Sequence, residues 1–114
     1  MKPFYITTPI YYVNDKPHIG HAYTTILADV VARHHRNSGK DVFFLTGLDE
    51  HGQKVQQAAE DNGKNAQDYC NNLAKDWQAF ATKLGLSNGD FVRTTEERHK
   101  TVVCLLYTSP SPRD

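Results

Sequence analysis

The pattern of hydrophobic and polar positions predicts a strand followed by a helix at the start of the chain. Residues 2–8 have the β-branched and aromatic content of a short buried strand, and Pro9 prevents that strand from continuing. An amphipathic helix follows and stops at Ser38-Gly39. Its apolar positions recur at helical spacing and are Ile19, Tyr23, Ile26, Leu27, Val30 and Val31.

A second strand is predicted at residues 42–45, where Val-Phe-Phe-Leu forms a continuous apolar run. Strand, helix and strand make a right-handed parallel unit, so the fold class is α/β with a parallel sheet. Ligands of such sheets bind beyond the carboxyl ends of the strands. We therefore expect residues 8–21 and the turn at residues 46–52 to face one crevice.

Three further elements are predicted before the chain changes character. Residues 53–62 form a helix that Gly63 ends, and Asn65 begins another that stops at Gly85. A third strand is expected at residues 91–94, followed by a helix that Thr95 caps. The helix after Asn65 has an apolar stripe that we interpret as core: Ala66, Tyr69, Cys70, Leu73, Trp77, Phe80 and Leu84.

The end of the chain differs in composition from the rest. Residues 104–114 lose helical periodicity and end in Ser-Pro repeats. We expect one domain over residues 1–103 and a non-native or disordered tail over 104–114, which resembles a translated adapter or a frameshifted end. A natural disordered terminus is the alternative.

Composition is typical of a soluble globular protein. The 114 residues carry no net charge, and 39% of them are hydrophobic. Neither a long apolar run nor a signal peptide is visible, so we expect a cytoplasmic protein. Cys70 and Cys104 lie in no metal-ligand or redox spacing, and Cys70 is expected to be a buried thiol. Without a basic surplus, charge gives no argument for nucleic-acid binding.

The first candidate site is His18-Ile19-Gly20-His21, at the start of the first helix. Helix N-termini attract anions because their first N–H groups lack internal partners. Gly20 lets a base or a phosphate approach the backbone, and both histidines can donate hydrogen bonds to phosphoryl oxygens. The alternative is two surface histidines at a helix start.

The second candidate site follows the strand at residues 42–45. The Asp49 carboxylate could receive a substrate ammonium. Helix capping is the alternative for both Asp49 and Glu50, because acidic residues in a first turn offset the helix dipole. His51 could be a ligand or a base, although a structural role is the better interpretation.

These motifs together resemble the methionyl-tRNA synthetases, a family of class I aminoacyl-tRNA synthetases. The tetrapeptide at residues 18–21 matches the class signature, His-Ile-Gly-His. Its flanks narrow the resemblance to the bacterial methionine type: Thr-Thr-Pro-Ile-Tyr-Tyr-Val-Asn at 7–14 and Phe-Leu-Thr-Gly-Leu-Asp-Glu-His-Gly at 44–52. The resemblance runs from about Phe4 to about Val103, and it implies the first half of a Rossmann-like nucleotide-binding catalytic domain.

The resemblance implies a two-step reaction. The methionine carboxylate attacks the α-phosphorus of ATP, giving methionyl-adenylate and pyrophosphate, and the methionyl group then passes to the tRNA. By position, His18 and His21 would be catalytic, contacting the ATP phosphates. Gly20 would lie under the adenine.

The same resemblance assigns three residues to methionine. Asp49 would hold its ammonium group, and Ile10 and Tyr12 would line its pocket. A pocket of this kind selects weakly, because one methylene is worth about 1–3 kcal/mol.

Other parts of the family pattern lie beyond this chain. The family continues with an insertion that often carries zinc, a second half-domain with a Lys-Met-Ser-Lys-Ser loop, and an anticodon-binding domain. ATP with magnesium, methionine and the methionine tRNA are the implied partners of the full-length enzyme. We expect the chain to be a fragment that is inactive by itself.

Three other interpretations stay open. The chain could be a small His-x-Gly-His adenylyltransferase, although Ser-Pro-Arg-Asp is no phosphate-binding motif. It could be a non-catalytic relic that binds methionine or ATP. The six histidines could form a metal site, but His34 and His35 point to different sides of a helix, and sequence places no third ligand beside His18 and His21.

Overall fold

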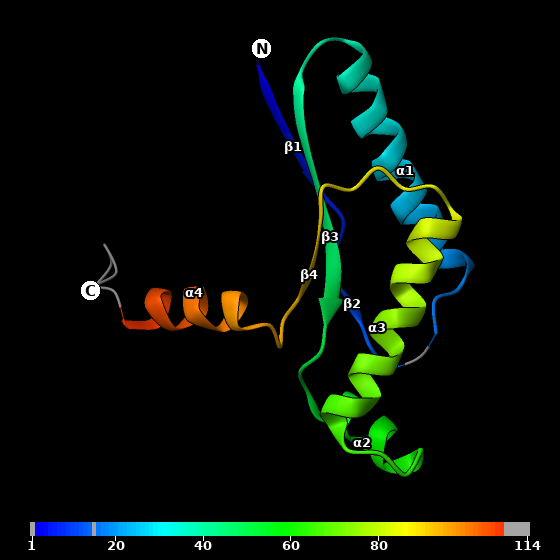
Figure 1. Cartoon of the computed structure of the whole chain (residues 1–114), viewed down its shortest axis with the longest axis vertical. Helices are drawn as coiled ribbons and strands as arrows, with labels where there is room; N and C mark the ends of the chain where they lie inside the picture. Colours follow the sequence, from blue (N-terminus) through cyan, green and yellow to red (C-terminus); the bar gives the residue numbers. More distant parts are fainter. Residues whose placement is uncertain (1, 15, 109–114) are drawn as a thin grey trace.

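A computed structural model describes residues 2–14 and 16–108. This part of the chain contains both strands and helices (Figure 1). Their bounds are β1 Pro3–Thr7, β2 Tyr11–Tyr12, α1 Ile19–Asn37, β3 Asp41–Asp49, α2 Gln53–Asp61, α3 Ala66–Lys83, β4 Asp90–Arg93 and α4 Glu97–Thr108.

Strand β3 is the centre of a parallel sheet, as the α/β prediction requires. Strands β1, β2 and β4 all pair with β3 in parallel orientation. Leu45 pairs with both Thr7 of β1 and Asp90 of β4, so these two strands lie on opposite edges of β3. Leu48 in the same way pairs with one residue of β2 and one of β4. Strands β1 and β2 therefore follow one another along the same edge.

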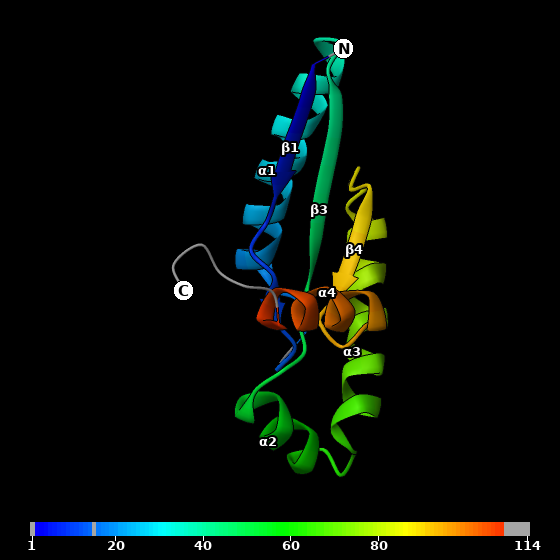
Figure 2. The same ribbon diagram turned by 90° about the vertical axis from the view of Figure 1, so that its left-hand side faces the viewer.

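Helices α1 and α3 lie on the same side of the sheet, and α4 projects from the other side (Figures 1 and 2). Two clusters of buried residues lie on the α1 and α3 side. The smaller cluster joins α1 to the sheet through Ala28, Ala32 and Phe44. The larger joins β2 and β3 to α2 and α3, and it consists of Val13, Leu48, Val55, Ala59, Tyr69, Cys70, Leu73, Ala74 and Trp77.

The buried face of α1 differs from the apolar stripe that predicted the helix. Ile19 and Tyr23 are 88% and 73% exposed, and Leu27 is also exposed. The small residues Ala28 and Ala32 are buried instead. Small side chains let the helix approach Phe44 closely, so they form the contact with the sheet. None of the helices in the described residues is long and apolar enough to span a lipid bilayer.

Strand β3 continues past the predicted turn at residue 46. The sequence prediction ended this strand at Leu45, where the apolar run stops, and it did not include β2. Thr46 is nevertheless buried, and its hydroxyl lies 2.7 Å from that of Thr8. Gly47 is buried directly against Val92 of β4. Polar and small residues thus belong to the strand because both of its edges are paired.

Helix α3 begins and ends as predicted. The side chain of Asn65 accepts a hydrogen bond of 2.8 Å from the Asp68 N–H. Gly85 has a φ of 66°, the left-handed conformation expected at a C-terminal stop.

Helix α4 extends further than the sequence analysis expects. Helical periodicity is lost at Cys104, but the helix continues to Thr108. Its last turns are exposed, with Leu106 at 72% and Tyr107 at 88%. The remainder of the predicted tail lies outside the described residues, and the domain boundary at 103 stays a prediction. Thr95 was expected to cap this helix, but its hydroxyl donates to Glu50 instead.

A polar cluster fixes α1 to the loop between α3 and β4. Asp29 accepts hydrogen bonds from the Ser87 N–H at 2.7 Å and from the Ser87 hydroxyl at 2.5 Å. Arg33 forms an ion pair with the same carboxylate at 2.8 Å. Burial raises the pKa of Asp29, but the bonds from Ser87 and Arg33 outweigh it and hold that pKa below its usual 3.8.

We predict that Asp29 contributes to the acid sensitivity of the fold. Its carboxylate has a lowered pKa in the folded chain, so its stabilisation is complete above the unfolded value of about 3.9 and is lost as pH falls through the folded value. Asp29→Asn should therefore lower the free energy of unfolding at neutral pH and flatten its decline in acid. Urea unfolding between about pH 6 and pH 3 measures this, with exposed Asp76→Asn as control. An acid slope that Asp29→Asn leaves unchanged would contradict the prediction.

We also predict that Gly47 cannot carry a side chain. A Cβ atom there would collide with the backbone carbonyl of Val92, which the β3–β4 pairing holds in place. Gly47→Ala should cost about 1–3 kcal/mol of unfolding free energy in urea titrations. Gly89→Ala is the matched control, since its Cβ would meet Phe43 at an ordinary 3.5 Å. Equal stabilities of the two variants would refute the prediction.

Candidate active site

The first candidate site, residues 18–21 at the start of α1, contains a helix cap that is made of two histidines. His18 is the N-cap of α1, and its Nδ1 accepts a hydrogen bond of 3.1 Å from the Gly20 N–H. The His21 Nδ1 accepts one of 3.2 Å from the His18 N–H. This reciprocal pair is a capping box, with imidazoles in place of the usual hydroxyl and carboxylate. Both histidines therefore have a structural role at the helix start, which the sequence analysis did not predict.

The cap also determines which ring nitrogen carries the proton. A neutral imidazole that accepts through Nδ1 is protonated on Nε2. His18 and His21 thus have Nε2–H groups, which are the donors that a phosphate oxygen needs. Helix capping and phosphate binding use different atoms of each ring, so the two roles are compatible.

Gly20 has a reason to be glycine within this corner. A Cβ atom at Gly20 would lie 2.9 Å from Cε1 and 3.2 Å from Nδ1 of His18. A side chain would therefore push the His18 imidazole away from the helix start. This constraint applies whether or not an adenine ring lies beside the backbone.

An aromatic cluster holds His21 against the rest of the fold. Its imidazole lies 4.6 Å from the Trp77 ring and 4.9 Å from the Tyr11 ring, measured between centroids. Tyr11 stacks on Trp77 at 5.2 Å, and its hydroxyl is 2.9 Å from that of Thr25. The sequence predicted Trp77 as core, and it is buried. Its contact with His21 was not predicted, because helical spacing predicts which face of a helix is buried but not which residues pack against that face.

The register of β2 brings together two of the residues that are predicted to bind methionine. Tyr12 is the Cα partner of Asp49, and neighbouring Tyr11 is the partner of Leu48. Side chains alternate between the faces of a sheet, and Leu48 is fully buried on the side of α3. Tyr12 and Asp49 therefore share the opposite face. Ile10 lies just before β2 and is 41% exposed.

The six candidate residues thus form two groups that are linked by β2. His18, Gly20 and His21 gather at the start of α1, and Tyr12 lies beside Asp49 on the open face of the sheet. The link is short, because Tyr11 contacts His21 and the next residue is Tyr12.

Neither Asp49 nor Glu50 caps α2, which was the alternative to a binding role. The N-cap of α2 is Gly52, and no side chain bonds to it. The Asp49 Oδ1 accepts a hydrogen bond of 3.2 Å from the His51 N–H. Glu50 is buried and forms an ion pair with Arg93. The imidazole of His51 lies 3.1 Å from the Thr94 carbonyl oxygen, which agrees with a structural role.

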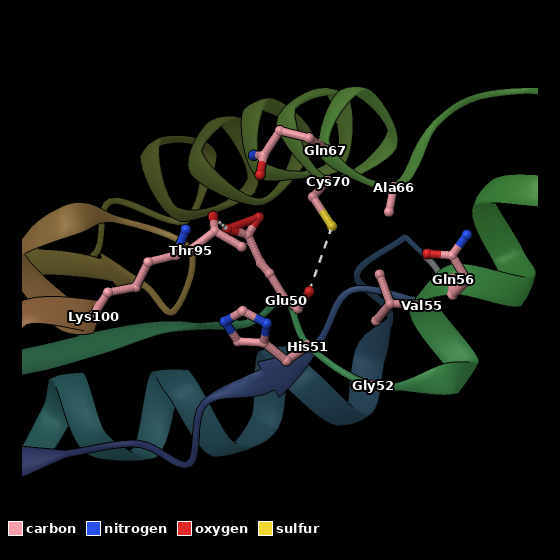
Figure 3. Close-up of a pocket in the computed structure, with 10 residues that line it drawn as sticks. All are labelled: Glu50, His51, Gly52, Val55, Gln56, Ala66, Gln67, Cys70, Thr95 and Lys100. Atoms are coloured by element: carbon pink, nitrogen blue, oxygen red, sulfur yellow. Dashed lines mark hydrogen bonds between the residues drawn. The ribbon is translucent and has the colours of Figure 1, made fainter. Parts of the chain in front are cut away.

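A pocket of about 300 Å³ lies beside Glu50 and His51 (Figure 3). None of the six candidate residues lines it. Cys70 does, and its thiol donates to the Glu50 carbonyl at 3.9 Å. Burial, together with the charge of Glu50, raises the pKa of Cys70 to about 11. The thiol therefore stays protonated near neutral pH, as expected of a buried structural cysteine.

The adjacent histidines His34 and His35 contact each other, and His35 has further partners in the protein. His35 stacks on Phe4 with 3.7 Å between ring centroids, and its Nδ1 lies 3.0 Å from the Lys40 ammonium. Partial burial lowers the pKa of His35, and the nearby Lys40 charge lowers it further. Within residues 2–14 and 16–108, no group of three or more His, Cys, Asp or Glu side chains could hold a metal ion.

We predict that His18 stabilises the fold as the N-cap of α1. His18→Ala removes the acceptor for the Gly20 N–H and should lower the unfolding free energy by about 1 kcal/mol. Asparagine is a good N-cap residue, so His18→Asn should retain most of the stability. Urea unfolding of the 114-residue chain measures both variants. The same loss in both would mean that the cap contributes nothing.

A family model and individual relatives of this chain point to the same protein family. The family model described as "tRNA synthetases class I (M)" matches residues 4–113. A methionine--tRNA ligase of Thermotoga maritima is 58% identical over 100 residues, which are 88% of this chain and 16% of that protein. One from Rickettsia bellii is 54% identical over 104 residues, covering 91% of this chain and 20% of the relative. The chain thus spans a fifth or less of the length of these relatives.

The fold agrees with a solved structure of the same family. The methionyl-tRNA synthetase of Mycobacterium tuberculosis in complex with methionyl-adenylate superposes with a TM-score of 0.87 and 44% identity. The match covers 89% of this chain and 20% of that one. Sequence motifs, parallel topology and these matches lead to one conclusion: the chain belongs to the class I tRNA synthetases of the methionine type.

Proposed function

We propose that this chain supplies the first half of the catalytic site of a methionine--tRNA ligase. The observation that carries the proposal is the similarity to a synthetase in complex with methionyl-adenylate, at 44% identity over 89% of the chain. Because the chain spans a fifth or less of its relatives, the complete reaction belongs to an enzyme that includes their remaining parts. The alternative of a small adenylyltransferase is not favoured by these relatives.

In this proposal, methionine binds on the open face of the sheet, beyond β2 and β3. The Asp49 carboxylate accepts hydrogen bonds from the substrate ammonium, and Tyr12 and Ile10 line the apolar side of the pocket. The register that pairs Tyr12 with Asp49 supports this assignment. Asp49 is half-buried, which strengthens a charge-assisted bond without closing the site to substrate.

In the same proposal, ATP binds at the start of α1. His18 and His21 donate from Nε2 to the phosphate oxygens, while the backbone at Gly20 lies under the adenine. Charge develops on these oxygens as a methionine carboxylate oxygen bonds to the α-phosphorus and the α–β phosphoanhydride bond breaks. Donors that are already oriented stabilise this transition state, and the capping bonds through Nδ1 hold both rings in place.

The second step consumes the adenylate. A hydroxyl of the terminal adenosine of the tRNA attacks the methionyl carbonyl, and AMP leaves. Magnesium would be bound mainly by the ATP phosphates, as is usual for this ion at nucleotide sites. Zinc in the insertion and a cytoplasmic location stay predictions.

The proposal is tested in a chimeric enzyme, in which residues 1–103 of this chain are joined to the part of the Thermotoga maritima relative that follows the matched region. It should catalyse methionine-dependent exchange of pyrophosphate into ATP and charge methionine tRNA. A folded chimera that does neither refutes the proposed function.

We predict that Asp49→Ala lowers kcat/KM for methionine in this exchange assay by about 10- to 100-fold, because a bond to a charged group is worth about 1.5–3 kcal/mol and the ammonium loses its counter-charge. Asp41→Ala is the matched control, since that exposed residue lies at the other end of β3. Near-normal exchange by Asp49→Ala would remove Asp49 from the site.

A further inference from the structure

Glu50 has the most buried carboxylate among the ion pairs of the described residues, and the proposed reaction does not use it. Its side chain is 0% exposed. Arg93 binds it with both ends of the guanidinium group, through Nε at 2.9 Å to Oε1 and through Nη2 at 2.9 Å to Oε2. The Thr95 hydroxyl donates to Oε1 at 2.7 Å. A buried charge persists only when it is paired in this way.

These contacts join three elements at the carboxyl end of the sheet. Glu50 follows the last residue of β3, and Arg93 is the last residue of β4. Arg93 also donates to the Asn71 side chain on α3 at 2.7 Å. We call this set, Glu50 with Arg93, Thr95 and Asn71, the Glu50 clamp. It adds side-chain contacts to the backbone pairing of β3 with β4 and ties both strand ends to α3.

Backbone contacts reinforce the clamp on both sides of Asp49. The Thr94 N–H donates to the Leu48 carbonyl at 3.2 Å, one residue before Asp49. The Glu50 N–H donates to the Thr94 hydroxyl at 2.8 Å, one residue after it. Asp49 itself accepts from the Val13 N–H through its carbonyl at 3.3 Å. Hydrogen bonds at Asp49 and at both of its neighbours thus fix the backbone here. The Asp49 side chain therefore projects from one defined face of the sheet.

The bidentate geometry indicates positioning rather than stability. A buried ion pair gains little over apolar residues of the same volume, because desolvation offsets the attraction. It does fix orientation, since two parallel bonds from a planar guanidinium prevent the carboxylate from rotating. Arg93 also neutralises Glu50, so that Asp49 presents its charge without a second unpaired carboxylate beside it.

We propose that Glu50 and Arg93 are positioning residues that aim the Asp49 carboxylate at the ammonium group of the amino-acid substrate. This rests on the proposed function, because the ammonium site is part of it. Without the Glu50 clamp, the backbone pairing of β3 would remain, but the residue that follows Asp49 would lose its fixed place, and the Asp49 side chain would be aimed less closely. The defect would affect methionine and spare ATP, whose proposed contacts lie at the start of α1.

The test uses the chimeric enzyme with Glu50→Gln, which keeps the size of the side chain and removes its charge. We expect the KM for methionine to rise about 10-fold or more and the KM for ATP to change less than twofold. Inhibition by 4-(methylthio)butanoate, which lacks the ammonium group, should stay unchanged. Asp90→Asn is the matched control, because it breaks the exposed Asp90–Arg98 pair at the other end of β4 and should change neither KM.

Two further variants separate positioning from loss of fold. In an Asp49→Asn background, Glu50→Gln should add no further loss, because the group that it aims is already disabled. Thr95→Val removes one hydrogen bond from the clamp and should raise the methionine KM about fivefold at unchanged ATP KM. If Glu50→Gln does not fold, Thr95→Val decides in its place.

The outcomes distinguish this proposal from the proposed function. If the unchanged chimera is folded and inactive, the proposed function fails. An active chimera in which Glu50→Gln or Thr95→Val raises both KM values equally, changes neither, or weakens the deaminated inhibitor overturns the positioning role. A selective rise for methionine that disappears in the Asp49→Asn background supports it.

Discussion

Pairing of β3 along both of its edges is the constraint on which the candidate site depends. Along one edge β3 pairs first with β1 and then with β2, and along the other with β4. A strand that is paired on both sides cannot twist away from the sheet, so its last residue has a defined place. Asp49 is that residue, and the close approach at Gly47 is what brings β4 near enough to fix it.

The sequence predicted the elements well wherever the signal was local. The parallel strand–helix–strand unit and the boundaries of α3 follow from apolar runs, Asn65 and Gly85, and all of them are confirmed. The length of β3 and the existence of β2 were missed, because Thr46 is in a strand only through contacts with residues far away in sequence. The apolar stripe of α1 predicted the helix but not its buried face, which small alanines form.

The candidate residues show the same division between local and distant information. Motifs brought His18, His21 and Asp49 to attention, but no pattern could pair Glu50 with Arg93, 43 positions later in the chain. For Glu50, sequence offered only helix capping as an alternative to a binding role, because acidic residues in a first turn offset the helix dipole. At the histidines, in contrast, the two competing interpretations are compatible, since one ring nitrogen caps the helix and the other has the proton that a phosphate would accept.

The shortness of β2 has a consequence for the geometry of the site. Its two residues point to opposite faces of the sheet, with Tyr11 against the His21 imidazole and Tyr12 beside Asp49. The two residues are consecutive, so a single peptide bond joins the side that holds the histidines to the side that holds Asp49. The relative positions of the two groups of candidate residues therefore depend on the backbone at Tyr11 and Tyr12.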